Sequence, residues 1–525
     1  MNRELALQRL TDGEITWDVL VIGGGATGLG VAVDAAARGY RTALVEQHDF
    51  AKGTSSRSTK LAHGGVRYLR SGEIGLVRGA LRERGLLARN APHLVRRRGF
   101  VIPVYRRIDL PIYGFGLKAY ERLSGQLSFG ASRRLSVAET KRLLPTVRVD
   151  GLRGGVLYYD GQFDDARLAL ALAQTADDQG ATVINYARVV SLPKKDGRII
   201  GAEIVDQETE RQFTVRARVV VNATGIFTDE IRRLDDPTVL PMLSVSSGVH
   251  LTLDRSFLPG EHALMIPHTS DGRVLFAVPW QDHVILGTTD EPRDAAELDP
   301  RPLEREIQFL LEHANHYLTK PVARADVLSV FTGLRPLVRK GNVAATKSLS
   351  RDHVIAVSPG GLVTITGGKW TSYRKMAEDA VTSAAEAGSL PVREAKTQSL
   401  RLHGAPATRG AATARRFAHY GTDVAALERL IETEPALARD FHPRLMLCGA
   451  EVVWAARHEM ARTLDDMLAR RNRALPLDAR AAIEIARPVA ELLARELGRD
   501  KRWVAAQVTE FATLAARHLL DDTAN

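Results

Sequence analysis

Three glycines near the start of the chain have the spacing of a dinucleotide-binding turn. Gly23, Gly25 and Gly28 follow an apolar run and precede an alanine-rich stretch. Gly23 allows a tight turn, Gly25 lets the backbone approach a pyrophosphate, and Gly28 lets a helix pack close to a strand. The free N–H groups at the start of that helix would face the phosphates. Because Glu46 ends the next apolar run, we expect it to bind ribose hydroxyls.

A glycine-rich turn alone is weak support for this chemistry, because such turns are common. Here a strand at 18–22, a helix through 31–38 and a second strand ending in an acid surround the turn in the right order. This order favours a nucleotide site over a purely structural turn. It also places Ala26 and Thr27 at the phosphates.

The bulk composition restricts the class of protein. A chain of 525 residues is too long for one core, so we expect two or three domains. Its single cysteine, Cys448, excludes an intramolecular disulfide and a cysteine-ligated metal site, and we predict no metal. Residues 1–17 lack the pattern of a signal peptide, and no run approaches the roughly 20 apolar residues of a membrane span. We therefore expect a cytoplasmic protein, in which an electron carrier would be organic or bound by ligands other than cysteine.

The net charge of +10 could indicate nucleic acid, anionic lipid or an anionic substrate as a partner. Short basic clusters occur at residues 96–98 and 470–471, but no nucleic-acid-binding module is recognisable. We expect no nucleic-acid partner, and a solvated basic surface is the favoured interpretation of most of the charge.

The elements that must position these groups follow from the apolar pattern. Residues 218–225 form a buried strand stopped by a glycine, and residues 243–338 alternate short β-rich runs with turns, which predicts an antiparallel sheet. Beyond residue 404 the chain is almost wholly helical. Segment 106–123 mixes apolar residues with cations, so it is either a helix in a bilayer interface or an internal helix.

Further motifs occur in a fixed order along the chain. They lie at residues 53–69, 161–168, 222–225, 248–250, 287–290, 333–337, 350–352, 367–374 and 458–466. With these motifs the chain resembles the FAD-dependent (aerobic, respiratory) glycerol-3-phosphate dehydrogenases, from about residue 19 into the C-terminal part.

The resemblance implies an α/β (α+β) fold. It would combine a Rossmann-like FAD-binding domain of the D-amino-acid-oxidase/glutathione-reductase type, an antiparallel-sheet substrate domain and a helical C-terminal cap. We expect an N-terminal extension at 1–16, an FAD-binding domain from 17–105, 160–242 and 340–392, a substrate-binding domain from 106–159 and 243–339, and a helical domain at 400–525.

The implied reaction is oxidation of sn-glycerol 3-phosphate to dihydroxyacetone phosphate, by hydride transfer to FAD with electrons passed to a quinone. It needs a base for the hydroxyl proton and cations for the phosphate and the developing alkoxide. His63 and His250 match family histidines near the reacting centre, and either could take the proton. The positions that match a substrate pocket are Arg67, Tyr68, Arg335, Arg351 and Lys369.

The resemblance also places residues around a non-covalent flavin. These are Ser55, Ser56, Lys60, His63, Gly64, Gly65, Thr224, Gly225, Gly367, Gly368 and Lys369. The last three would direct a helix N-terminus at the flavin ring, where its positive end stabilises an anionic reduced flavin. Covalent attachment is disfavoured, because His63 would then be both the attachment point and a candidate base.

Three other functions stay open at this stage. They are a glycerol-3-phosphate oxidase that uses oxygen, a flavin oxidoreductase of amino or hydroxy acids, and a lipid- or nucleic-acid-binding protein without catalysis. The chain lacks the long insertion of the oxidases, which favours a quinone, and its several cations favour phosphate over carboxylate. The resemblance further implies peripheral attachment to anionic lipid at the inner face of the cell membrane, and it allows a homodimer.

Overall fold

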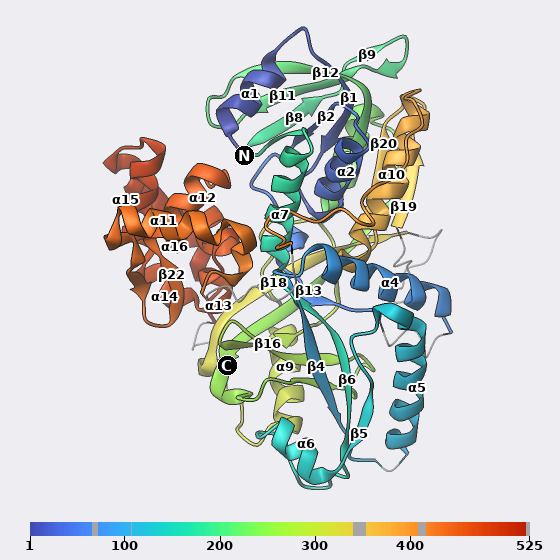
Figure 1. Cartoon of the computed structure of the whole chain (residues 1–525), viewed down its shortest axis with the longest axis vertical. Helices are drawn as coiled ribbons and strands as arrows, with labels where there is room; N and C mark the ends of the chain where they lie inside the picture. Colours follow the sequence, from blue (N-terminus) through green and yellow to red (C-terminus); the bar gives the residue numbers. More distant parts are fainter. Residues whose placement is uncertain (66–71, 107, 340–352, 408–415, 521–525) are drawn as a thin grey trace.

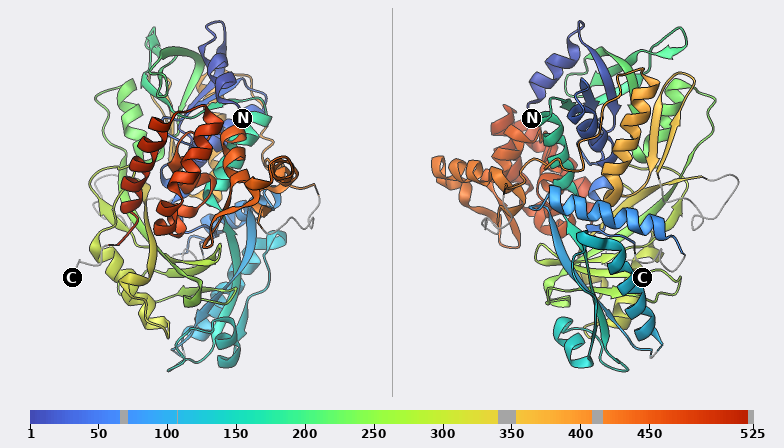
Figure 2. Two further views of the ribbon diagram at one scale, coloured as in Figure 1. Left: turned by 90° about the vertical axis from the view of Figure 1, so that its left-hand side faces the viewer. Right: turned by 45° about the vertical axis from the view of Figure 1, so that its right-hand side comes forward.

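The computed structural model describes residues 1–65, 72–106, 108–339, 353–407 and 416–520. Two sheets follow each other along the long axis, and a helical C-terminal domain lies beside them (Figure 1). Two further views show the same three parts (Figure 2).

Among the described residues, the first sheet has eight strands. Its parallel strands run in the order β20, β12, β1, β2, β7, and β19, β11 and β8 join them antiparallel. The strands are β1 (Thr16–Ile22), β2 (Thr42–Val45), β7 (Thr182–Ile184), β8 (Ala187–Ser191), β11 (Gly201–Asp206), β12 (Gln212–Asn222), β19 (His353–Val357) and β20 (Val363–Gly367). A short hairpin, β9 (Lys194–Lys195) with β10 (Arg198–Ile199), extends from it.

Helices cover this sheet because its parallel strands are apolar on both faces. In β1, the run Val19 to Ile22 is almost fully buried. The neighbouring helices are α1 (Arg3–Thr11), α2 (Ala26–Ala37), α7 (Asp165–Asp178), α8 (Thr228–Asp235) and α10 (Tyr373–Ala387). The expected extension at 1–16 therefore holds a helix, α1, which packs near β7.

The second sheet has ten strands within the described chain. They are β3 (Leu61–Ala62), β4 (Val95–Pro103), β5 (Arg133–Leu135), β6 (Gly155–Phe163), β13 (Leu243–Asp254), β14 (Ala263–Ile266), β15 (Leu275–Trp280), β16 (His283–Gly287), β17 (Glu291–Arg293) and β18 (Val327–Val338). Helices α4 (Ile74–Asn90), α5 (Asp109–Ser124), α6 (Val137–Leu143) and α9 (Glu304–Tyr317) pack around it. Its pairs are antiparallel except β4 with β14, so the predicted sheet type is correct in the main.

One expected domain boundary differs from the strand pairing. β4 lies inside the segment 17–105 assigned to the FAD-binding domain, but it pairs with β6 and β14 of the second sheet. β3 also pairs with β6. The chain thus enters the second sheet before residue 105. The sequence does not predict this boundary, because the apolar pattern of β4 is compatible with either sheet and does not identify the partner strand.

The C-terminal domain is helical, as expected. Its elements are α11 (Val424–Thr433), β21 (Asp440–His442), β22 (Leu445–Cys448), α12 (Gly449–His458), a π-helical turn (Asp466–Arg471), α13 (Ala474–Leu477), α14 (Ala479–Glu484), α15 (Ala486–Leu497) and α16 (Lys501–Ala516). Buried ion pairs join it to the first sheet: Arg471 donates to Asp49 at 2.8 Å, and Arg167 of α7 donates to Glu459. The ion pair with Asp49 therefore fixes the loop that follows β2 against the C-terminal domain.

Most of segment 106–123 lies in α5 (Asp109–Ser124), one face of which packs as expected of an internal helix. Leu117 and Tyr120 are buried, whereas Ile108, Ile112 and Phe115 are exposed at 67%, 57% and 72%. One face therefore packs on the protein and the other presents apolar side chains to solvent. No helix among the described residues is both long and apolar enough to cross a bilayer.

Candidate active site

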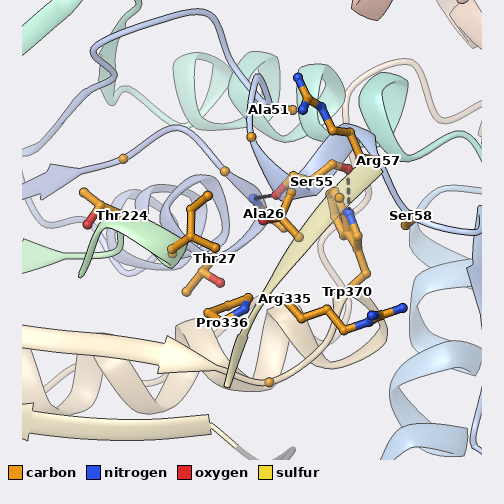
Figure 3. Close-up of a pocket in the computed structure, with 18 of the residues that line it drawn as sticks. Ala26, Thr27, Ala51, Ser55, Arg57, Ser58, Thr224, Arg335, Pro336 and Trp370 are labelled. Carbon is orange, nitrogen blue, oxygen red and sulfur yellow. Dashed lines mark hydrogen bonds between the residues drawn. The ribbon is translucent and has the colours of Figure 1, made fainter. Parts of the chain in front are cut away.

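A cavity of about 420 Å³ lies where the two sheets meet. The glycine turn after β1, the 3-10 turn Thr54–Ser56, strands β13 and β18, and the start of the 3-10 turn Trp370–Ser372 line it. Figure 3 shows Arg335 and Trp370 among the residues that line this space, with Trp370 beside Ser55. The strand ends and turns of both sheets therefore meet at one site.

The glycine turn has the geometry of a nucleotide cradle. Gly23 adopts a φ of +112°, which L side chains rarely adopt, and a Cβ on Gly28 would lie only 1.9 Å from the carbonyl oxygen of Gly23. Helix α2 can pack this closely only because residue 28 is glycine. The Ala26 N–H donates to Oγ of Ser55 at 2.9 Å (Figure 3). This bond fixes the turn against the next loop.

Glu46 lies at the end of β2, where the sequence predicts it. Its carboxylate lines the cavity and accepts N–H groups from Gly24 at 2.6 Å and His48 at 2.7 Å. Burial raises the pKa of Glu46, and these backbone donors oppose the rise. An oriented carboxylate at this place can accept hydroxyl groups of a ribose.

These residues fit an FAD on three grounds. The glycine turn is open for a close backbone approach, the helix N-terminus of α2 borders the cavity, and the cavity continues from Glu46 to the second sheet. Thr224, Gly225, Gly367, Gly368 and Lys369 line the same space, as expected. Backbone amides and glycines there suit a pyrophosphate and a flat ring system.

His250 lies at the far end of the cavity, on β13. Its ring stacks on Phe331 with centroids 4.8 Å apart, and its Nε2 lies 2.8 Å from Oγ1 of Thr59. Burial lowers the pKa of His250 well below its usual value, and the positive charges of Lys60 and Arg335 lower it further. The imidazole is therefore neutral and held in a fixed orientation, as a proton acceptor must be.

Arg335 supplies a fixed positive charge to the same end. Its two Nη atoms donate to the carbonyl oxygens of Ser247 and Thr289, each at 2.9 Å, and to Oγ1 of Thr288 at 3.1 Å. The side chain is 26% exposed and borders the cavity. Nη1 also lies 3.5 Å from Oδ1 of Asp290, so the guanidinium is held by two carbonyl oxygens, a hydroxyl group and a carboxylate.

His63 and Lys369 complete the predicted set that the structure describes. Both border the cavity. The carbonyl oxygen of His63 accepts from Oγ1 of Thr371 at 3.4 Å, next to the turn that follows Lys369. The same cavity is thus lined by four predicted residues that are far apart in sequence: His63, His250, Arg335 and Lys369. Arg67, Tyr68 and Arg351 lie outside the described residues.

Five predicted cofactor residues do not border the cavity: Gly28, Ser56, Lys60, Gly64 and Gly65. Gly28 acts through packing, as argued above. Lys60 is the clearest correction, since its fully buried ammonium donates to the Ser56 carbonyl at 2.7 Å and to Asp165 at 2.8 Å. A sequence motif gives the identity of a residue but not the direction in which its side chain points. Here the ion pair with the buried carboxylate of Asp165 directs the Lys60 side chain into the protein interior.

Sequence reasoning assigned no role to Thr59 or Trp370. Thr59 is the hydrogen-bond partner of His250, and the indole N–H of Trp370 donates to the Ser55 carbonyl at 2.8 Å (Figure 3). Thr59 lies in the motif at residues 53–69 and Trp370 in the motif at residues 367–374. Their positions in these motifs could have indicated a role for each.

Comparison with known proteins agrees with this geometry. A family model described as FAD dependent oxidoreductase matches residues 18–374, and one described as the C-terminal domain of alpha-glycerophosphate oxidase matches residues 363–503. Both sheets fall in the first match and most of the helical domain in the second.

Two curated relatives are similar over somewhat less than two thirds of the chain. A probable mitochondrial glycerol-3-phosphate dehydrogenase of Caenorhabditis elegans is 45% identical over 352 residues, which are 65% of this chain and 48% of that protein. The mitochondrial glycerol-3-phosphate dehydrogenase of Homo sapiens is 45% identical over 337 residues, 61% of this chain and 46% of that protein. The chain spans about half the length of the curated relatives it matches.

Two solved structures are similar to this chain, one over nearly all of it and one over 70% of it. The glycerol-3-phosphate dehydrogenase from Bacillus halodurans complexed with FAD has 29% identity and a TM-score of 0.81, covering 99% of this chain and 98% of that one. An L-alpha-glycerophosphate oxidase from Mycoplasma pneumoniae with FAD bound has 17% identity and a TM-score of 0.55, covering 70% and 95%, and shares the fold. These findings confirm the expected fold class, the FAD cofactor and the family resemblance: the chain belongs to the FAD-dependent oxidoreductase family.

Proposed function

We propose that this chain oxidises sn-glycerol 3-phosphate to dihydroxyacetone phosphate and passes two electrons to a quinone. The observation that carries the proposal is the neutral imidazole of His250 beside the positioned guanidinium of Arg335, at the end of an FAD cradle. The glycerol-3-phosphate dehydrogenases among the relatives support the choice of substrate.

Proton removal in this reaction would be carried out by a residue of the chain itself. Bound FAD supplies an acceptor for the hydride that leaves C2 of the alcohol. We assign His250 as the base that removes the hydroxyl proton, because it is neutral and oriented by Thr59 and Phe331. His63 is the second candidate base, since it borders the same cavity. The proton goes to the imidazole, and C2 becomes a carbonyl.

Two cations would hold the substrate and stabilise the developing negative charge. Arg335 can bind phosphate through a guanidinium fork, and Lys369 can act as a point charge near the reacting oxygen. We assign Arg67, Tyr68 and Arg351 to the same pocket on the family resemblance alone. A doubly charged phosphate needs several such partners, whereas a carboxylate needs fewer.

The electron acceptor and the location are part of the same proposal. Helix α5 presents Ile108, Ile112 and Phe115 to solvent beside the exposed cations Lys118 and Arg122. An apolar stripe flanked by cations suits the headgroup region of an anionic bilayer, next to the hydrocarbon core in which a membrane quinone dissolves. We therefore propose peripheral attachment to the inner face of the cell membrane. A homodimer is also proposed, and light scattering of the detergent-solubilised protein tests it.

A substrate and acceptor panel tests the proposed reaction. Purified protein is assayed with glycerol 3-phosphate, lactate and sarcosine, each with a soluble quinone analogue or with oxygen as acceptor. We expect turnover with glycerol 3-phosphate and the quinone analogue. Faster turnover with oxygen would make the chain an oxidase, and preference for lactate or sarcosine would contradict the substrate.

A further inference from the structure

Outside the candidate active site, a second cavity of about 190 Å³ lies where the C-terminal domain meets β4 and β6. At about 30 Å³ for each molecule of liquid water, its volume equals that of about six waters. Among the described residues that line it, seven are arginines and three are carboxylates. We call it the arginine cavity. Its size suits a small ion or metabolite rather than a cofactor.

Strand alternation divides the basic cluster at residues 96–98 between two faces. Arg96 and Arg98 border the arginine cavity. Arg97 does not, and its guanidinium instead lies over the ring of Tyr159, 3.6 Å from the centroid. Successive side chains of a strand point to opposite faces, so β4 brings two of its three arginines to one place. The proposed catalytic chemistry uses none of the three.

Most arginines of the cavity have a carboxylate partner within the protein. Arg167 pairs with Glu459 and Arg471 with Asp49, and both of these carboxylates lie behind the cavity wall. Arg96 is different, because its side chain has no hydrogen bond or ion pair within the described part of the chain. Its charge is therefore not balanced by a described neighbour.

Two buried arginines also retain an unused donor at this cavity. Arg167 is 4% exposed and Arg473 is 2% exposed, and Nε of each has no acceptor among the described protein groups. A buried N–H without an acceptor is unfavourable, so an acceptor in the cavity would be stabilising. These two atoms and the side chain of Arg96 can all donate to the same kind of ligand, an anion with several oxygens.

Two histidines add donors without adding charge. His93 and His419 border the cavity, and burial lowers the pKa of His93 to about 4 and that of His419 well below its usual value. The nearby Arg167 lowers both further. The rings are thus neutral, and an anion bound here would raise both pKa values.

We propose that the arginine cavity binds a small oxyanion of the phosphate class, either inorganic phosphate or the phosphate group of a small metabolite. Arg96 would hold it from β4, and Arg473 from the C-terminal domain, whereas Arg98 already donates to Gln162 and Glu261. A guanidinium fork matches the geometry of two phosphate oxygens. Several arginines together can bind the tetrahedral oxygens of one phosphate, whereas a carboxylate ligand has only two oxygens to accept their N–H groups. The proposal does not rest on the proposed substrate.

Isothermal titration calorimetry of the FAD-loaded protein with inorganic phosphate tests the site. Ionic strength is kept constant with chloride, and wild type is compared with Arg96→Gln and with the matched control Arg97→Gln on the same strand. Both residues are exposed, so both variants should fold, which FAD content and the unfolding midpoint verify. A second series with glycerol 1-phosphate and with acetate separates a phosphomonoester site from a free-phosphate or carboxylate site.

We expect phosphate binding that is at least about tenfold weaker in Arg96→Gln and unchanged in Arg97→Gln, since a charge-assisted hydrogen bond is lost only in the first. The KM for the enzyme's substrate should be the same in all three proteins. Identical isotherms for the three proteins would overturn the proposal, as would equal weakening in both variants, which indicates general screening of a basic surface. Acetate binding as tight as phosphate binding would overturn the assigned ligand class.

Discussion

Thr59 holds His250 in place: Oγ1 of Thr59 lies 2.8 Å from Nε2 of His250, whose other face stacks on Phe331. Thr59 reaches this position from the loop that follows the cofactor turn, whereas His250 belongs to the second sheet. The contact therefore joins the flavin-binding part of the chain to the proposed base.

Removal of the Thr59 hydroxyl should slow the reaction without releasing FAD. We expect Thr59→Val to lower kcat about fivefold, because the imidazole loses a hydrogen bond worth about 1 kcal/mol that fixes its orientation. Thr59→Ser keeps the hydroxyl and should restore most of the rate. Steady-state kinetics and FAD absorbance measure both. Equal kcat in Thr59→Val and wild type would show that the bond does not position the base.

The acidic limb of the pH profile should respond to Lys60. A base works only when deprotonated, and the pKa of His250 lies well below its usual value, so kcat/KM should fall only at a pH well below 6.5. The Lys60 charge contributes to that lowering, and Lys60→Met should move the limb to higher pH by less than about one unit. Substrate ionisation is the same for both proteins and cancels in the comparison. A limb that moves to lower pH would contradict the assignment.

Arg335→Ala should lose activity while it keeps its flavin. We expect kcat/KM to fall by at least about a hundredfold, because the charge-assisted bonds of Arg335 to phosphate are each worth about 1.5–3 kcal/mol. The ratio of bound FAD to protein should stay close to that of wild type. Arg305→Ala removes an arginine that is 66% exposed on α9 and serves as the control. Loss of FAD in proportion to activity would make Arg335 a structural residue.

The apolar face of α5 should carry membrane binding. We expect the double variant Ile112→Ser, Phe115→Ser to bind anionic vesicles at least about tenfold more weakly, since each large side chain contributes about 1.5–3 kcal/mol when fully buried. Val392→Ser is the control, because Val392 is 94% exposed elsewhere in the chain. Vesicle flotation at two salt concentrations measures binding. Equal weakening in the control would remove α5 from the docking surface.

The sequence predicts the cofactor half of this molecule well. The turn at Gly23, the acid Glu46 and the strands around them are local features, so spacing along the chain is enough to place them. The proposed base and the cation Arg335 were found through motifs, and the structure shows that their strands, β13 and β18, are neighbours.

Other features depend on long-range contacts that spacing does not report. The apolar spacing at 453–467 predicts one buried helical face, but Met460 has a φ of +53° and separates α12 from the π-helical turn. Of the five residues expected on that face, Val453, Met460, Leu464 and Met467 are buried, whereas Ala456 is half-buried. The inward direction of Lys60 likewise depends on Asp165, which is about a hundred residues away.

Anaerobic stopped-flow reduction tests the central claim most directly. The FAD-loaded protein is mixed with sn-glycerol 3-phosphate without oxygen, and flavin absorbance is followed in wild type and in His250→Asn. The account predicts rapid bleaching in wild type and bleaching slower by about a hundredfold or more in the variant, as for loss of a general base. A flavin that stays oxidised in wild type, while dithionite still reduces it, would contradict the account.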